Sequence, residues 1–437
     1  MPSPSFSPSR RFPRIPIRIL ALAAATLNLS LLSQAQTETV IYSFPGEHGP
    51  GEPGAGLVFD AAGNLYGTTV LGGSHNFGTL YELSPISGGG WQETTIHSFT
   101  GGNDGGLPNS PLIIDGSGNL YGTTQVGGTK QQGTVFEFSP IAGGGYQETV
   151  LHSFAGEDDG GGPSAGVIFD SAGNLYGTTS DDGAHGAGTV FELSPQTGGA
   201  WKLTTLVPFT GNEEGGVPYA GMVFDAAGNL YGTALNGGNS IDCPARNENG
   251  CGVVFELSPS IGGGWRERVI HSFKGPDGAL PYGGVVLDSS GNLYGTTYEG
   301  GAGSCSPVGG SGCGVVFKLS AGHNWHEAVI HSFTGGTDGA APIGGLTLDA
   351  SGNVYGTTEI GGDTTYSGCS PNGCGVVFEL IPYSGPRWDE VALHDFTQSP
   401  DGAVPVGSLI FDSSGNLYGT TAAAGAFGSG TVFEITP

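Results

Sequence analysis

The chain has 437 residues and a formal net charge of −27, and it contains 85 glycines and 28 prolines but few charged residues. Such a negative charge disfavours binding to nucleic acid or to an anionic membrane surface, because both would repel the protein. Glycine and proline at this frequency indicate either low complexity or a fold of many short strands and tight turns. The regular apolar and aromatic content favours the second.

The first 35 residues have the features of a secretory signal peptide. Four arginines between positions 10 and 18 precede an apolar segment, residues 19–32, and small residues at Ser33 and Ala35 mark a cleavage site. The apolar segment is shorter than the ~20 residues that span a bilayer, which argues against a membrane anchor. We therefore expect cleavage after Ala35 and an extracellular, periplasmic or cell-surface location. The mature chain, residues 36–437, would have 8 basic and 39 acidic residues and no transmembrane segment.

One short sequence recurs seven times in the remainder of the chain. Gly-Asn-Leu-Tyr-Gly-Thr, with Val once in place of Leu, is repeated at intervals of 55 to 63 residues. Its asparagines are Asn64, Asn119, Asn174, Asn229, Asn292, Asn353 and Asn416. Repetition at such a period is typical of propellers and solenoids, in which each repeat is one supersecondary unit.

Each repeat predicts four short strands, which in the first repeat cover residues 54–60, 64–69, 78–83 and 91–99. Asp60 caps the tight turn between the first two strands, and Gly63 supplies the positive φ that the turn needs. Four strands separated by turn signals, without a helical period, indicate a propeller blade.

The ends of the chain predict how the blades close. Residues 36–44 match a fourth strand, and residues 430–435 match a third strand. Pairing these two would complete a seventh blade and remove both open sheet edges. An open solenoid, the alternative, would need distinct capping repeats at its ends. We therefore predict a single all-β domain over residues 36–437, a seven-bladed β-propeller of four-stranded antiparallel blades sealed by its termini.

The repeat also carries a family resemblance. Its GNLYGTT and GTVFELSP strings, with the His-Ser-Phe that ends the fourth strand, resemble the Gloeo/Verruco (GloVer) tandem repeat of exported bacterial proteins over essentially all of residues 36–437. The resemblance implies export and a repeat-built β structure, but no particular reaction. A looser similarity, at the level of fold, links the strand-Asp-x-x-Gly-Asn-strand pattern to NHL-like propellers.

Six cysteines form three pairs, each between a predicted second and third strand of an enlarged repeat. The pairs are Cys243 and Cys251, Cys305 and Cys313, and Cys369 and Cys374. In an exported chain such pairs predict one local disulfide per loop, and the spacing does not suit zinc. The bridges could brace long glycine-rich insertions or shape a binding surface, and both interpretations stay open.

An acidic residue stands four positions before the proline of six repeats, in the connection from one blade to the next. These residues are Asp104, Asp159, Glu214, Asp277, Asp338 and Asp401. We expect them on the same face as the cysteine loops, as a candidate acidic binding ring. Ca²⁺ is the cation that such oxygen ligands favour. The competing explanation is turn chemistry, which we favour because carboxylates on separate blades are too far apart to share one ion.

The fourth strands carry a histidine in five repeats, which we expect to have packing roles because a metal site needs convergent ligands. These residues are His97, His152, His271, His331 and His394.

The leading functional hypothesis is a secreted, non-enzymatic, monomeric propeller that needs no cofactor and binds a protein or glycan through its loop face. Two alternatives are an enzyme, such as a lyase or glycoside hydrolase using channel carboxylates, and a structural envelope or matrix component. No catalytic residues are assigned, because the near-uniform repeats offer no asymmetric set of an acid, a base and a nucleophile.

Overall fold

The computed structural model describes residues 36–436, apart from residues 47–48, 239–242, 244–249, 306–311, 323, 366–367 and 370. Residues 36–437 form one compact unit. Its described part consists of strands and loops without a helix, and hence includes no helix of the length and apolar character that spans a membrane. The predicted signal peptide, residues 1–35, lies outside the described residues and stays a prediction.

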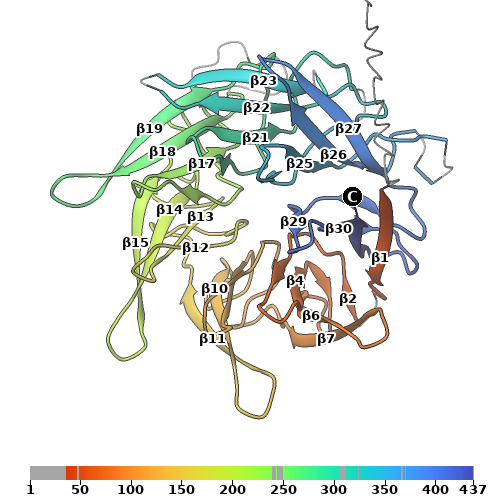
Figure 1. Ribbon diagram of the computed structural model, residues 1–437. Helices are drawn as coiled ribbons and strands as arrows, with labels where there is room; N and C mark the ends of the chain where they lie inside the picture. Colours follow the sequence, from red (N-terminus) through yellow and green to blue (C-terminus); the bar gives the residue numbers. More distant parts are fainter. Residues whose placement is uncertain are drawn as a thin grey trace, which may run out of the picture. The chain divides into compact units, whose positions relative to one another are not determined.

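Seven antiparallel sheets form the blades of a β-propeller, arranged in a ring (Figure 1), which confirms the predicted fold. We number the blades 1 to 7 in the order of the repeated asparagines. The first strands of the blades are β3 (Val58–Phe59), β8 (Ile113–Ile114), β12 (Ile168–Phe169), β16 (Val223–Phe224), β20 (Val286–Leu287), β24 (Thr347–Leu348) and β29 (Ile410–Phe411). The second strands are β4 (Leu65–Thr69), β9 (Leu120–Thr124), β13 (Leu175–Thr179), β17 (Leu230–Ala234), β21 (Leu293–Thr297), β25 (Val354–Thr358) and β30 (Leu417–Ala423).

The third and fourth strands are longer than the first. The third strands are β6 (Thr79–Pro85), β10 (Thr134–Pro140), β14 (Thr189–Pro195), β18 (Val253–Pro259), β22 (Val315–Ser320), β26 (Val376–Pro382) and β31 (Thr431–Thr436). The fourth, outer strands are β7 (Trp91–Ser98), β11 (Tyr146–Ser153), β15 (Trp201–Pro208), β19 (Trp265–Ser272), β23 (His326–Ser332), β27 (Trp388–Asp395) and, in blade 7, β1 (Thr37–Ser43). Short strands also pair β2 (Pro50–Gly51) with β5 (Leu71–Gly72), and β28 (Ala403–Pro405) with β30.

The ring is closed by the two ends of the described chain, as predicted. β1 pairs antiparallel with β31, from Thr37 opposite Thr436 to Ser43 opposite Thr431. The Phe44 N–H then donates to the Gly430 carbonyl over 3.0 Å, and the Phe44 side chain is fully buried. Figure 1 shows β1, in red, beside the blue strands of the last blade. Every blade thus has its four strands, and β31 is paired on both sides, with β1 and with β30.

The repeated Asp-x-x-Gly-Asn-Leu-Tyr sequence forms one hydrogen-bonded turn in each blade. In blade 1, Asp60 Oδ1 accepts bonds from the Ala62 and Asn64 N–H groups, and Oδ2 accepts from the Asn64 side chain and the Tyr66 hydroxyl. Burial would raise the pKa of Asp60, but these hydrogen bonds outweigh it and lower that pKa. The turn therefore explains why aspartate, asparagine and tyrosine recur together. The predicted first strand is shorter than expected, because only Val58 and Phe59 pair with β4.

The hydrophobic core lies between neighbouring blades, with one apolar cluster at each of the seven interfaces. Between blades 2 and 3, for example, Val135 and Phe154 pack with Val167 and Phe191. Burial of apolar side chains is the main favourable contribution to folding. The stability of each blade therefore depends on contact with its neighbours.

The glycine of the repeated Leu-Tyr-Gly-Thr strand leaves space for an aromatic ring from the third strand. In blade 3, Gly177 pairs with Phe191 across the sheet. A Cβ at Gly177 would lie 2.5 Å from the ring of Phe191, which is fully buried. The same packing recurs in the other blades, with Tyr81 as the ring in blade 1. Glycine at this position is therefore a packing requirement.

Replacing this glycine should destabilise the protein. We expect Gly177→Ala to lower the free energy of unfolding by about 1–3 kcal/mol, because the added methyl displaces the Phe191 ring in a close-packed interface. Gly116→Ala is the control, since a Cβ there meets no atom within 4 Å. Urea unfolding of both variants measures the difference. A Gly177→Ala variant as stable as Gly116→Ala would contradict this explanation.

Candidate functional site

A cavity of about 480 Å³ lies at the centre of the ring, where all seven blades contribute to its lining. The lining is mostly apolar and is formed largely by the segments that lead into the first strands. Among the described lining residues, Glu52 is the one carboxylate. An enzyme with channel carboxylates would need at least two convergent acids with distinct roles, and the lining does not provide such a pair.

One position of the repeat contributes a lining residue from every blade. It is the residue after the repeat's proline, and its seven occupants are Gly54, Asn109, Ser164, Tyr219, Tyr282, Ile343 and Val406. Blades 1–3 supply small or polar residues here, blades 4 and 5 supply tyrosines, and blades 6 and 7 supply aliphatic residues. The backbone repeats in all seven blades, but the residues at this position differ. The lining of the cavity therefore has a polar side and an aromatic, apolar side.

Tyr219 and Tyr282 form the aromatic side of the lining, and Tyr298 packs against Tyr282. The rings of Tyr219 and Tyr282 lie 5.5 Å apart between centroids, and those of Tyr282 and Tyr298 lie 5.4 Å apart, both edge to face. All three side chains are half-buried. Burial raises the pKa of Tyr298 to about 12, and its hydrogen bond to Glu359 adds to the shift. The Tyr298 hydroxyl therefore stays protonated at neutral pH. These residues were not among the predicted site residues, although variation at the position after the proline was a usable signal for Tyr219 and Tyr282.

An unusual backbone conformation positions these lining residues. The residue before the repeat's proline has a φ between 53° and 60° in all seven blades. The occupants are Glu52, Leu107, Gly162, Val217, Leu280, Ala341 and Val404. A left-handed φ is rare for residues other than glycine and strained for β-branched valine. Because this φ recurs in every blade, we infer that the surrounding hydrogen bonds enforce it. The left-handed turn directs the residue two positions later, which follows the proline, toward the cavity.

The three predicted disulfides are present, and they support this conformation. They join Cys243 to Cys251, Cys305 to Cys313 and Cys369 to Cys374. The carbonyl of the second cysteine in each pair accepts the N–H of the left-handed residue in the next blade over 2.9 Å, as Cys251 does from Leu280. The disulfide loops therefore contact the joints between blades, and the Cys251 loop accepts a hydrogen bond from the turn that carries Tyr282. Disulfides of this kind are typical of an oxidising, non-cytoplasmic compartment.

Each of the six predicted ring acids has a local partner. Asp104 accepts hydrogen bonds from the N–H and the hydroxyl of Thr100, and its Oδ2 lies 3.2 Å from His97 Nε2. The corresponding pairs are His152 and Asp159 at 3.1 Å, His271 and Asp277 at 3.2 Å, His331 and Asp338 at 3.4 Å, and His394 and Asp401 at 3.0 Å. Glu214, which accepts from the Thr210 hydroxyl over 2.6 Å, has Val207 in place of the histidine.

The histidines and the acids are therefore one structural feature, which the sequence analysis treated as two. Their nearly constant separation, seven residues in four pairs and six in the His271 pair, was the signal that could have connected them. The connections that carry the acids lie beside the second-to-third-strand loops. For example, the Ala279 N–H donates to the Glu299 carbonyl over 2.8 Å.

A one-residue bulge in each outer strand determines which way its polar side chains face. In blade 1, Leu80 pairs with His97 and Tyr81 pairs with Thr95, so Ile96 is the extra residue. In a regular strand, residues four apart share one face, but an extra residue reverses the alternation. Glu93 consequently interacts with Tyr42 of blade 7, whereas His97 faces Glu148 of blade 2.

Glutamates near the start of the outer strands complete the interfaces, and no sequence-based prediction included them. Glu148 Oε2 lies 3.8 Å from His97 Nε2. Burial raises the pKa of Glu148 to about 7, and Asp104 adds to the shift. Equivalent charged contacts bring Glu327 to His271 and Asp277, Glu390 to His331 and Asp338, and Glu38 to His394 and Asp401. Leu203 replaces this glutamate in blade 3.

The interface between blades 3 and 4 provides a test of these buried acids, because it has a glutamate but no histidine. Burial raises the pKa of Glu267 to about 7, and Glu214 adds to the shift. Since the folded-state pKa exceeds the unfolded one, ionisation of Glu267 destabilises the fold as pH rises from about 5 to about 8. Glu267→Gln should therefore raise the melting temperature relative to the wild type more at pH 8 than at pH 5.

The control for this comparison is Glu157→Gln, at an exposed position, which should show no such pH-dependent gain. Thermal unfolding followed by circular dichroism measures both variants. A Glu267→Gln effect of the same size at the two pH values would contradict the assignment of a buried, protonated carboxyl group.

Several solved propeller structures are similar to the chain. One is the calcium structure of a family AA12 carbohydrate-active enzyme from Trichoderma reesei, with 13% identity over 92% of this chain and 96% of that chain and a TM-score of 0.44. A putative oxidoreductase (glucose dehydrogenase) from Thermus thermophilus has 14% identity over 92% of this chain and 100% of that chain, with a TM-score of 0.40. A Dyadobacter fermentans protein of unknown function has 12% identity over 92% of this chain and 100% of that chain, with a TM-score of 0.43. Similarity at these identities concerns the fold alone.

Comparison with curated proteins finds no match. The pattern of the Gloeobacter/Verrucomicrobia repeat, in contrast, matches residues 28–243, 87–304 and 243–437. These matches include all seven copies of the turn, the bulged outer strands and the three disulfide loops described above. The chain therefore belongs to the Gloeobacter/Verrucomicrobia repeat family.

Proposed function

We propose that the protein is a secreted, non-enzymatic propeller that binds a neutral carbohydrate in its central cavity. The observation that carries this proposal is the pair of half-buried tyrosines, Tyr219 and Tyr282, in the cavity lining. Their rings offer a rigid apolar surface with a polar end. The C–H face of a pyranose ring can pack on such a surface.

The opposite side of the cavity supports the same ligand class. Asn109 and Ser164 line it with an amide and a hydroxyl, which can exchange hydrogen bonds with sugar hydroxyls. A mainly apolar pocket with a few polar groups is the usual composition of a small-ligand site. The chain's charge of −27 disfavours anionic ligands. A neutral oligosaccharide therefore fits better than a polyuronate, a phosphorylated ligand or nucleic acid.

The three disulfides support the proposed location, because they are stable outside the reducing cytoplasm. We further infer that the protein acts as a monomer, since closure of the ring uses its own terminal strand. A protein partner on the loop face and a structural role in the envelope are the competing functions, which the experiment below distinguishes from carbohydrate binding.

The test is a screen on a glycan array, followed by calorimetric titration with neutral gluco-, xylo- and manno-oligosaccharides. We expect binding of at least one neutral oligosaccharide, and weaker or no binding of uronic acid oligomers. Tyr282→Ala should weaken that binding at least about tenfold, because it removes the central ring of the cluster. The melting temperature of the variant verifies that it folds.

Tyr383→Ala is the matched control. Tyr383 is an exposed tyrosine outside the cavity, and its loss should leave the affinity unchanged. A blank array together with blank titrations would refute the proposal, and so would a folded Tyr282→Ala variant with wild-type affinity.

A further inference from the structure

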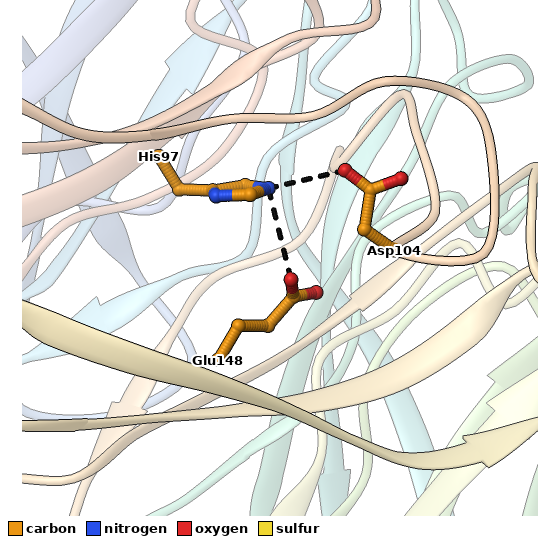
Figure 2. A group of neighbouring side chains, drawn as sticks. All are labelled: His97, Asp104 and Glu148. Carbon is orange, nitrogen blue, oxygen red and sulfur yellow. Dashed lines mark hydrogen bonds and ion pairs between the residues drawn. The ribbon is translucent and has the colours of Figure 1, made fainter.

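At two of the four blade interfaces that combine a histidine, an aspartate and a glutamate, the donor atoms lie close enough together to share a metal ion. Figure 2 shows His97, Asp104 and Glu148 pointing toward one another, with His97 Nε2 at 3.2 Å from Asp104 Oδ2 and 3.8 Å from Glu148 Oε2. The ligand atoms of this group all lie within 4.8 Å of one another, and the same holds for His271, Asp277 and Glu327. The first group joins blades 1 and 2, and the second joins blades 4 and 5.

The three donor atoms suit a small divalent transition metal. Zn²⁺ binds imidazole nitrogen and carboxylate oxygen at about 2.0–2.2 Å in tetrahedral geometry, so its ligand atoms lie roughly 3.3–3.6 Å apart. The separations of 3.2 and 3.8 Å around His97 Nε2 lie on either side of that range. Ca²⁺ prefers six to eight oxygen ligands, and an imidazole among three donors argues against it. A water molecule would supply the fourth ligand of Zn²⁺.

The glutamates provide an independent indication. Within the part of the chain that the structure describes, Glu148 Oε1 and Glu327 Oε1 are buried and have no hydrogen-bond partner, as is also true of Oε1 in Glu38, Glu267 and Glu390. Leaving a carboxylate in this state is costly unless a proton or a cation neutralises it. A bound metal ion would compensate both carboxylates of each group at once. The side chains of His97, Asp104 and Glu148 are 24%, 15% and 18% exposed, so the group is sheltered but accessible to an ion.

We propose that the interfaces between blades 1 and 2 and between blades 4 and 5 each bind one divalent transition-metal ion, for which Zn²⁺ is the probe. Each ion joins a histidine and an aspartate of one blade to a glutamate of the next. Its role is structural, because it links two sheets that otherwise meet through apolar contacts. The interface between blades 2 and 3 keeps the histidine and aspartate but has Leu203 instead of the glutamate, and it binds no metal.

The experiment uses tag-free, metal-free mature protein. Calorimetric titration with Zn²⁺ should give two sites per chain, and Zn²⁺ in excess should raise the melting temperature, because it binds the folded state. Glu148→Gln should reduce the stoichiometry to one, and Glu148→Gln combined with Glu327→Gln should abolish both the binding and the thermal shift. The amide keeps the shape of the side chain, so these variants should fold.

Glu93→Gln is the matched control, since it changes the equivalent glutamate in an interface without a histidine or an aspartate, and it should retain two sites. Ca²⁺ and Mg²⁺ titrations should show no binding at these sites. The proposal is overturned if Zn²⁺ does not bind, or if the double variant still binds two ions, which would place them on other surface groups. It is equally overturned if Ca²⁺ binds where Zn²⁺ does not.

Discussion

The extra residue in each outer strand is the constraint on which the blade interfaces depend. Without it, the glutamate and the histidine of one strand would face the same neighbouring blade. With it, Glu93 faces blade 7 and His97 faces blade 2. At four of the seven interfaces, this reversal places the carboxyl group of a glutamate from one blade opposite a histidine from the preceding blade. Polar groups that would be solvent-exposed on an isolated sheet thereby become part of the joints between blades, outside the apolar clusters.

The joints are not all alike, and the differences follow a pattern. The histidine, aspartate and glutamate occur together at four interfaces, whereas Leu203, Val207 and Tyr42 each alter one of the other three. The disulfides occur only in blades 4 to 6 among the described residues. They support the joints that follow those blades, including the turn before Tyr282. The half of the ring that carries the disulfides therefore overlaps the half that presents tyrosines to the cavity.

The sequence predicted the architecture well because its determinants are local and repeated. The Asp60 turn and the strand pattern recur seven times, and the incomplete blade at each end leaves one way to close the ring. The cysteine pairs were equally predictable, since their partners are eight or five residues apart.

The site was less predictable because its contacts cross from blade to blade. His97 and Asp104 are close in sequence, but Glu148 belongs to the next repeat, and only the bulge at Ile96 turns His97 toward it. A bulge has no sequence signature in an alternating strand, since the extra residue is itself apolar. The tyrosines of the cavity were missed for a related reason. Their position projects inward through a left-handed residue such as Leu280, which propensity does not favour at a non-glycine position.

A pair of double-mutant cycles, measured by urea unfolding in the presence of a chelator, tests the central role of the bulge most directly. One cycle combines His97→Asn with Glu148→Gln, and the other combines His97→Asn with Glu93→Gln. The bulge predicts a coupling of roughly 0.5–3 kcal/mol between His97 and Glu148, and additivity within about 0.5 kcal/mol between His97 and Glu93. Coupling between His97 and Glu93, with additive effects of His97 and Glu148, would show that both side chains face the same blade and would contradict the account.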